Sequence, residues 1–130
     1  MLKIKNMMLT NVITASPKIS VKEAIGDLFE KHVGSVVLVD SGQKCVGIFT
    51  ERDAIRLVAE DVDLNKLLGE VMTKNVITVG LDSSIDEVRQ IVQTHHVRHL
   101  PVLDDDGRLV GLLSVRDILD QFFGFTSHHC

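Results

Sequence analysis

The sequence predicts an α+β fold built from two tandem copies of one β-α-β-β-α motif. First, the sequence matches itself at an offset of 64: residues 8–58 align with 72–122 without a gap, and 14 of the 51 pairs are identical. Second, helical and strand periods of apolar residues recur in the same order in both copies. One copy of about 50 residues buries little apolar surface alone. We therefore expect the copies to pack sheet to sheet, with pseudo-two-fold symmetry and two related clefts between them.

The repeat divides the chain into residues 1–63, the first motif with an N-terminal segment, and 64–130, the second motif with a linker helix and a C-terminal tail. Together the two ranges form one module. The linker, roughly residues 61–71, carries apolar residues at helical spacing, so we expect it to pack against the motifs. These residues are Leu64, Leu67, Leu68 and Val71.

The first motif begins with a short strand, Val12–Ala15, which ends at a Ser-Pro pair. Ser20, with Glu23 three residues later, predicts a capping box that opens a helix. Gly34 is placed to end this helix. The apolar residues that the helix is expected to bury are Ala24, Ile25, Leu28 and Phe29.

Two β-branched, apolar strands follow, Val36–Val39 and Val46–Phe49, joined by a turn over Asp40–Lys44. A second helix is expected from Glu51 to about Glu60. The second motif repeats this order, with a strong turn signal in its Asp-Asp-Asp-Gly sequence. Its elements are the helix face Ile85, Val88, Ile91 and Val92, the strands Leu100–Leu103 and Leu109–Leu113, and the turn Asp104–Gly107.

Composition narrows the functional classes. The net charge is −4 with no clustered basic stripe, which argues against nucleic-acid binding as the main role. No apolar run approaches the ~20 residues that span a bilayer. The cysteines, Cys45 and Cys130, do not suggest a disulfide framework. We therefore expect a soluble, cytoplasmic protein without a membrane or nucleic-acid partner.

The junction after the last strand of each motif has the pattern Gly-x-x-Thr/Ser-x-x-Asp. It runs from Gly47 through Thr50 to Asp53, and again from Gly111 through Ser114 to Asp117. One interpretation is a capping box at a helix start. The other is a nucleotide site, because a helix start favours phosphate, and an Asp carboxylate accepts both hydroxyls of a ribose.

This duplicated pattern resembles the nucleotide-binding motif of cystathionine-β-synthase (CBS) domains, and Val97–Asp104 is similar to the second-strand signature of that family. The resemblance covers about residues 8–123 and implies a stand-alone CBS pair. It implies AMP, ADP, ATP or S-adenosylmethionine as ligand, with AMP or ATP preferred, and no cofactor. It also implies a homodimer in which the helices of two pairs form a disc.

Carried over residue by residue, the resemblance gives each part of the site a role. Asp53 and Asp117 hold ribose hydroxyls, while Thr50 and Ser114 contact phosphate or ribose. Arg98 and His99 meet phosphates, followed in the motif by Leu100 and Pro101. Arg52 and Arg116 are further basic candidates. The adenine-facing segments are Ile13, Thr14 and Ala15 in the first motif and Ile77, Thr78 and Val79 in the second.

The two copies differ where phosphate is expected to bind. Arg98-His99-Leu100-Pro101 aligns with Gly34-Ser35-Val36-Val37, so the first copy has neither the basic pair nor the proline. We therefore expect one site to bind more tightly than the other.

Histidines raise the alternative of a metal site, at His95, His96 and His99 or in the tail His128-His129-Cys130. His95 and His96 are adjacent near a predicted helix end, where histidine is favourable without a metal. No catalytic constellation accompanies them, so no metal and no catalytic residue is predicted.

The leading hypothesis is a regulatory, energy-sensing module that acts through a ligand-dependent conformational change. Such a module has no enzymatic activity of its own and regulates an enzyme or transporter in trans. The alternative is a ligand-free interaction module in which the Thr/Ser-to-Asp pairs are only helix caps. Near the C-terminus, Phe122, Phe123 and Phe125 are candidates for a dimer contact or for closure of the core.

Overall fold

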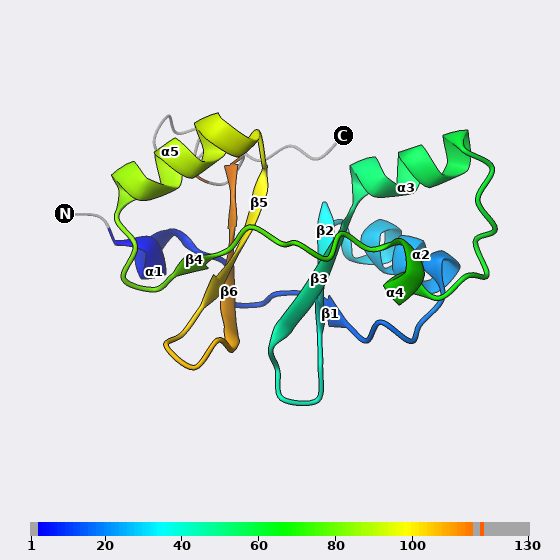
Figure 1. The fold of residues 1–130 in the computed structure, drawn as a ribbon, viewed down its shortest axis with the longest axis horizontal. Helices are drawn as coiled ribbons and strands as arrows, with labels where there is room; N and C mark the ends of the chain where they lie inside the picture. The colour runs from blue at the N-terminus through cyan, green and yellow to red at the C-terminus, as the bar shows by residue number, and fades with distance from the viewer. Residues whose placement is uncertain (1–2, 116–117, 119–130) are drawn as a thin grey trace. The chain divides into compact units, whose positions relative to one another are not determined.

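The computed structural model describes residues 3–115 and residue 118. Among these residues the strands form two three-stranded sheets, and helices accompany each sheet (Figure 1). The predicted α+β class with one motif used twice is confirmed. The elements are α1 (Ile4–Met7), β1 (Thr14–Ala15), α2 (Val21–Lys31), β2 (Ser35–Val39), β3 (Cys45–Thr50), α3 (Glu51–Ala59), α4 (Leu68–Val71), β4 (Val79–Gly80), α5 (Ile85–His95), β5 (His99–Leu103) and β6 (Leu109–Ser114).

The two sheets have the same topology. In each, the short first strand is parallel to the central strand, and the central strand is antiparallel to the third. The pairs Ser35–Thr50 and His99–Ser114 occupy equivalent positions in the two registers, 64 residues apart. The expected strands are therefore present, although β1 is two residues shorter than predicted.

The chain folds into two compact units whose limits differ from the sequence ranges 1–63 and 64–130. The first unit comprises residues 13–76, and the second combines the described parts of 1–12 and 77–130. Ile4 and Met7 of α1 are buried in the same core cluster as Leu100 and Leu113. The N-terminal segment therefore completes the core beside the second copy, not the copy that follows it in the sequence.

The linker plays the equivalent role in the first unit. Leu68 is fully buried in the cluster that contains Phe49 and Leu57. Ile48 exchanges two backbone hydrogen bonds with Thr73, both 3.1 Å long. The linker packs as expected, but it is helical only over α4, and Leu67 remains 47% exposed.

Gly47 and Gly111 have a packing role at these crossings. A Cβ atom added to Gly47 would overlap Sδ of Met72, and one added to Gly111 would overlap Sδ of Met8. Because each methionine packs directly over the glycine backbone, a larger residue there displaces the crossing segment.

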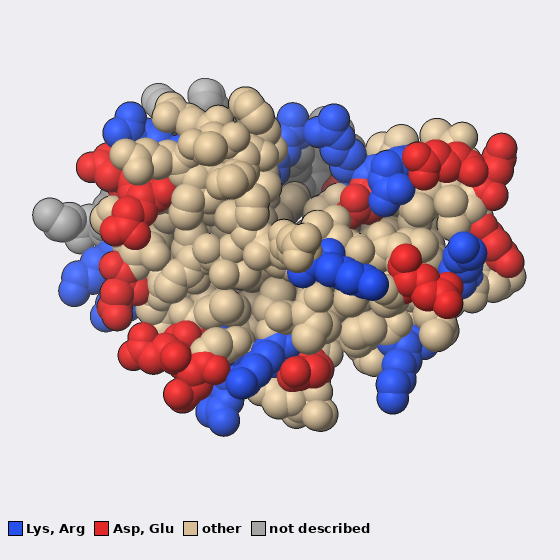
Figure 2. Space-filling model, viewed as in Figure 1, with Lys and Arg blue, Asp and Glu red and all other residues tan. Residues whose placement is uncertain are grey.

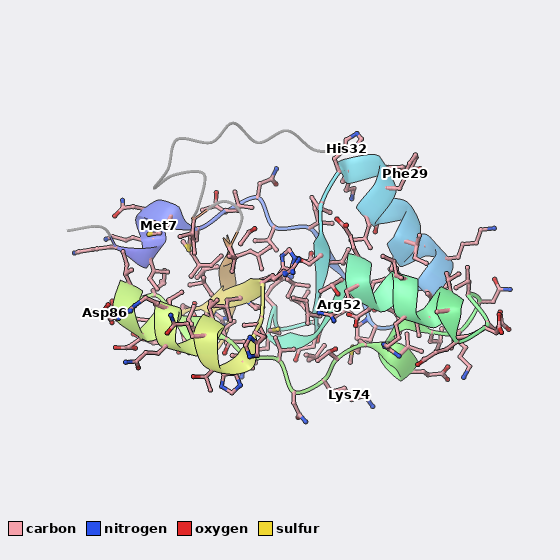
Figure 3. All side chains as sticks on the ribbon, turned by 90° about the horizontal axis from the view of Figure 1, so that it is seen from above. Met7, Phe29, His32, Arg52, Lys74 and Asp86 are labelled. Atoms are coloured by element: carbon pink, nitrogen blue, oxygen red, sulfur yellow. The ribbon has the colours of Figure 1, made fainter. Side chains whose placement is uncertain are left out.

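Helices α2 and α5 begin at the predicted residues, but only the serine half of the predicted capping box is formed among the described residues. The Ser20 hydroxyl oxygen accepts a hydrogen bond from the Glu23 backbone N–H at 3.1 Å, and Ser84 does the same with Glu87. The predicted burial of Phe29 was wrong, because this side chain is 78% exposed near the end of α2 (Figure 3).

The predicted helix end at Gly34 was also wrong. His32 is the C-cap residue of α2, with φ of 54°, and His96 is the C-cap residue of α5, with φ of 55°. Histidine is among the non-glycine residues enriched in this left-handed region. The repeated histidine therefore marks the helix end in both copies.

The turns between the last two strands are organised by an aspartate. Asp40 Oδ1 accepts hydrogen bonds from the backbone N–H groups of Gly42 and Lys44, at 2.9 and 3.0 Å. Asp104 Oδ1 makes the equivalent pair of bonds. The turn needs a positive φ, which Gly107 adopts at 83° and Gln43 at 64°.

Candidate ligand-binding site

The junction of β3 and α3 contains a complete capping box. Thr50 Oγ1 accepts a hydrogen bond from the Asp53 backbone N–H at 3.2 Å. Asp53 Oδ2 accepts bonds from the Thr50 backbone N–H at 2.9 Å and from the Thr50 hydroxyl at 3.1 Å. The helix-capping interpretation of the Thr-x-x-Asp spacing is therefore correct for the first copy.

The cap leaves binding capacity on the second carboxylate oxygen. Asp53 Oδ1 lies 3.8 Å from Arg56 Nη2, and the Asp53 side chain is 17% exposed. A carboxylate offers about four lone-pair sites, of which the cap occupies those on Oδ2. Helix capping and acceptance of two ribose hydroxyls at Oδ1 are therefore compatible.

The start of β2 lies directly beside this junction. Ser35 is paired with Thr50 across the strands, and the Glu51 backbone N–H donates to the Gly34 carbonyl oxygen at 3.0 Å. Ser35 is 4% exposed, and its hydroxyl has no hydrogen-bond partner among the described residues. A buried hydroxyl without a partner is uncommon in folded proteins. Ser35 was not among the predicted site residues, and its alignment with His99 was the signal that could have identified it.

The predicted adenine-facing segment lies on the other side of β2. Thr14 is paired with Val37 and Ala15 with Leu38, so β1 and β3 flank β2. Ile13 and Ala15 pack against the core cluster, while Thr14 is exposed. This part of the site therefore offers the Thr14 side chain and backbone groups at its surface.

The second copy repeats the junction. His99 is paired with Ser114, and the Val115 backbone N–H donates to the Arg98 carbonyl oxygen at 2.9 Å. Arg98 is exposed and His99 partly buried. Arg116 and Asp117 lie outside the described residues, so the second Ser-x-x-Asp unit is described only at Ser114.

The other predicted residues of the second copy have mainly core positions. Leu100 is 1% exposed within the core cluster, and Pro101 is fully buried. Val79 of β4 is buried, Ile77 packs against the same cluster, and Thr78 is partly exposed. Arg98, His99, Ser114 and the partly exposed Thr78 are therefore the predicted residues of this copy whose described side chains have polar groups to offer a ligand.

Charged side chains of both signs are mixed over the visible surface (Figure 2). Arg52 lies exposed on the first turn of α3 (Figure 3). Its neighbour Arg56 is shared between Asp53 and Glu60, at 3.8 and 3.1 Å. Arg52 is therefore the arginine of this helix that no described ion pair engages.

Cysteine and histidine chemistry offers no alternative site among the described residues. Burial raises the pKa of the Cys45 thiol, which lies 3.7 Å from the Gly47 carbonyl oxygen. A raised pKa keeps the thiol neutral near pH 7 and disfavours a nucleophilic role. Within residues 3–115 and 118, no three His, Cys, Asp or Glu side chains are grouped to hold a metal. The tail His128-His129-Cys130 and the phenylalanines at 122, 123 and 125 lie outside the described residues.

Comparison with known proteins identifies the family. The CBS domain model matches residues 4–60 and again 68–124, so the chain belongs to the CBS domain family. An uncharacterised 17.7 kDa protein of Acidianus ambivalens is 33% identical over 116 residues, which are 89% of this chain and 70% of that protein. The inosine-5′-monophosphate dehydrogenase of Nitrosopumilus maritimus is 34% identical over 92% of this chain, which spans only 25% of that enzyme.

Solved structures give the same result. A CBS domain pair in complex with 5′-methylthioadenosine and S-adenosyl-L-methionine is 32% identical, with a TM-score of 0.86 over 95% of this chain and 97% of that one. A CBS domain protein of Pyrobaculum aerophilum in complex with AMP is 25% identical, with a TM-score of 0.83 over 89% of both chains. Among the helices that the structure describes, none has the length and apolar character to cross a membrane.

Proposed function

We propose that this chain is a regulatory module that binds adenosine-containing ligands at its strand-to-helix junctions. The observation that carries the proposal is the Thr50–Asp53 pair, whose capping box leaves Asp53 Oδ1 available to hydroxyl donors. The similar solved CBS proteins contain AMP, or 5′-methylthioadenosine with S-adenosyl-L-methionine. AMP and ATP are the first ligands to test, and no cofactor is proposed.

In the first copy, Asp53 Oδ1 accepts the ribose hydroxyls, and Thr50 is held in place by its bonds to the same carboxylate. Backbone groups of Ile13 to Ala15 face the base. In the second copy, Ser114 and Asp117 take the equivalent roles, with Arg98 and His99 beside the 5′ substituent. Arg52 and Arg116 remain candidates for additional phosphate contacts.

The proposed action is regulation and not catalysis. A ligand bound more strongly by one conformation shifts the population toward it, and a partner enzyme or transporter that senses this conformation is regulated in trans. We propose a cytoplasmic location. The alternative function, an interaction module without a ligand, is favoured by one observation: the reciprocal bonds of Thr50 and Asp53 already give this residue pair a role as a helix cap.

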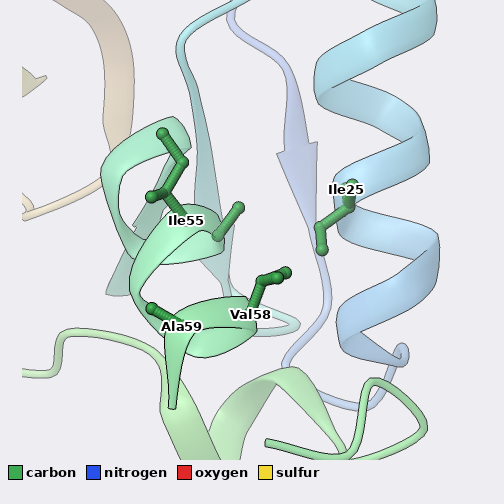
Figure 4. Close-up of a pocket in the computed structure, with 5 residues that line it drawn as sticks. Ile25, Ile55, Val58 and Ala59 are labelled. Atoms are coloured by element: carbon green, nitrogen blue, oxygen red, sulfur yellow. The ribbon is translucent and has the colours of Figure 1, made fainter. Parts of the chain in front are cut away.

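We also propose that the chain forms a homodimer through α2 and α3. Phe29 is 78% exposed, Ile55 70% and Val58 59%. Ile55 and Val58 line an apolar depression together with Ile25, Ala54 and Ala59 (Figure 4). Contiguous exposed apolar surface marks interaction sites. Sedimentation analysis of Ile55→Glu tests this: a monomer is expected, and an unchanged dimer contradicts the assignment.

Isothermal titration with AMP, ADP, ATP and S-adenosylmethionine tests the binding function. Asp53→Asn keeps a cap acceptor but replaces the second oxygen by an amide that donates, so it should abolish binding at the first copy. Asp117→Asn tests the second copy. Ser20→Ala is the matched control, because it removes a helix cap away from the junction.

Binding that is lost in an Asp→Asn variant and retained in Ser20→Ala supports the ligand function. The interaction-module alternative predicts instead that the folded wild type binds none of the four ligands, and that Asp53→Ala changes only stability, by about 1 kcal/mol.

A further inference from the structure

The two junctions carry opposite charge patterns at equivalent positions. The first copy has Gly34, Ser35 and Glu51 where the second has Arg98, His99 and Val115. The strand pairs Ser35–Thr50 and His99–Ser114 place the middle residue of each set beside the hydroxyl residue of the junction. The two sets therefore occupy the same place in each motif.

Backbone hydrogen bonds fix the outer two residues of each set together. The Glu51 N–H donates to the Gly34 carbonyl oxygen at 3.0 Å, and the Val115 N–H donates to the Arg98 carbonyl oxygen at 2.9 Å. A carboxylate residue is thus bonded to glycine in the first copy, and an arginine is bonded to valine in the second. At this hydrogen-bonded pair of residues, the second copy therefore lacks the carboxylate that the first copy has, and it carries an arginine that the first copy lacks.

The first copy is poorly suited to a phosphate. Glu51 and Asp53 both lie in the first turn of α3, where their carboxylates oppose the anion that a helix start otherwise attracts. Of the two arginines on this helix, Arg56 already pairs with Asp53 and Glu60. A 5′-phosphate carries close to two negative charges at pH 7, so it would meet two carboxylates here against one arginine of this turn that no described ion pair engages, Arg52. The second copy has Val115 in place of Glu51 and therefore lacks one of these carboxylates.

Ser35 supplies the complementary observation. Its hydroxyl is buried, uncharged and without a partner among the described residues, beside the Thr50–Asp53 pair. A hydroxyl both donates and accepts, so a neutral polar group of a ligand satisfies it without bringing in charge. His99 occupies the equivalent position in the second copy. Its imidazole ring has N–H groups that donate hydrogen bonds to an anion such as phosphate.

We propose that the first copy selects an adenosine whose 5′ substituent is uncharged, while the second copy selects a 5′-phosphorylated adenosine. This inference rests on the proposed function and names a ligand class for each site. Asp53 binds the ribose of the neutral ligand, and Ser35 hydrogen-bonds to it near the 5′ position. Arg98 and His99 bind the phosphate at the second site.

The test is isothermal titration of the full chain with 5′-methylthioadenosine, adenosine and AMP. The wild type should bind 5′-methylthioadenosine and adenosine, and this binding should be lost in Asp53→Asn and retained in the double variant Arg98→Gly/His99→Ser. AMP binding should show the reverse dependence. Loss of AMP binding in Asp53→Asn, with the double variant unaffected, overturns the assignment. If the folded wild type binds none of the three ligands, the proposed function itself fails.

Exchange of the charge pattern gives the second test. Gly34→Arg/Ser35→His should raise the affinity of the first site for AMP by about tenfold or more, as expected for an added charge-assisted hydrogen bond. It is measured in the Arg98→Gly/His99→Ser background, where the first site alone responds. An unchanged AMP affinity in the folded protein contradicts the proposal.

Glu51→Gln is a more conservative test, made in the same Arg98→Gly/His99→Ser variant. Glu51 is exposed, so its replacement should not disturb folding. It should strengthen AMP binding at the first site by about two- to fivefold at low salt, since exposed charges act weakly and are screened. Its 5′-methylthioadenosine affinity should stay constant. An AMP affinity at low salt that Glu51→Gln leaves unchanged also overturns the charge argument.

Discussion

The two copies of the motif have nearly the same backbone and different chemistry at one point of it. Helices α2 and α5 begin and end at equivalent residues, and the central strands pair in the same register. Beside the junction, however, Ser35 and Glu51 stand where His99 and Val115 stand in the second copy. Positions that shape the backbone, such as His32 and His96, are therefore the same in both copies, while these two positions beside the junction differ.

The units also differ in where their last core element comes from. In the first unit it is α4, which follows the first motif in the sequence, whereas in the second unit it is α1, which comes from the beginning of the chain. Each unit thus contains a helix of four residues. Helix α4 packs against the motif that comes just before it in the sequence, whereas α1 packs against the motif that is distant from it in the sequence. This comparison can be tested by substitutions, beginning with the largest expected effect.

Ile4→Ala tests whether α1 is part of the second unit. Ile4 is 1% exposed, so its truncation should lower the free energy of unfolding by about 2–5 kcal/mol. Hydrogen exchange should accelerate in α5 and β5 more than in α2, because the lost contacts lie in the core with Val88 and Leu100. Faster exchange confined to α2 would contradict the assignment.

Gly47→Ala tests the crossing of the linker. The new methyl group would overlap Met72 and lie 3.1 Å from the Thr73 carbonyl oxygen, so we expect a loss of about 1–3 kcal/mol in chemical denaturation. Gly26→Ala is the matched control: nothing lies within 4 Å of its added Cβ, and in helix α2 alanine should be stabilising by about 0.5–1 kcal/mol. Gly111→Ala should reproduce the loss against Met8.

Thr50→Ala tests the cap alone. It removes the acceptor for the Asp53 N–H and should cost about 1 kcal/mol of stability, similar to Ser20→Ala at the start of α2. Thermal unfolding of both variants measures this. A loss for Thr50→Ala far above that for Ser20→Ala would show that the junction contributes more than a helix cap.

Gln43→Gly should have the smallest effect and the opposite sign. Gln43 has φ of 64°, a region that costs an L-residue roughly 1–2 kcal/mol, and Gly107 occupies the equivalent position. Part of the gain is lost to the greater freedom of glycine when unfolded, so a net stabilisation of about 0.5 kcal/mol is expected. Denaturation midpoints measure it, and destabilisation would show that the Gln43 side chain contributes contacts of its own.

Much of the fold was predictable because it depends on local patterns. The repeat, the Ser20 and Ser84 caps and the aspartate-led turns each follow from a few neighbouring residues. Phe29 was misassigned because helical periodicity identifies an apolar face but does not say how much of it the sheet covers. Gly34 was misassigned because a glycine near a helix end is a strong signal, while histidine in the left-handed region is a weaker one.

The candidate site also has residues that local sequence patterns predicted and residues that they did not. The sequence predicted Thr50 and Asp53, because their three-residue spacing at a helix start brings them together by local geometry. It did not identify Ser35, whose position beside Thr50 depends on pairing between two strands and whose burial depends on packing around them. The sequence also did not predict that the two carboxylate oxygens of Asp53 have different neighbours, with Oδ2 in the helix cap and Oδ1 near Arg56.

The sequence by itself determined the duplicated motif, its helix starts, its turns and the residue types at both junctions, since these are set by interactions within a few residues or by the repeat itself. Only the tertiary structure decided that α1 completes the core of the second unit, that Gly47 and Gly111 are covered by methionines, and that Ser35 is buried without a partner among the described residues. The physical reason is that these features arise from contacts between segments distant in the chain, which no local pattern records.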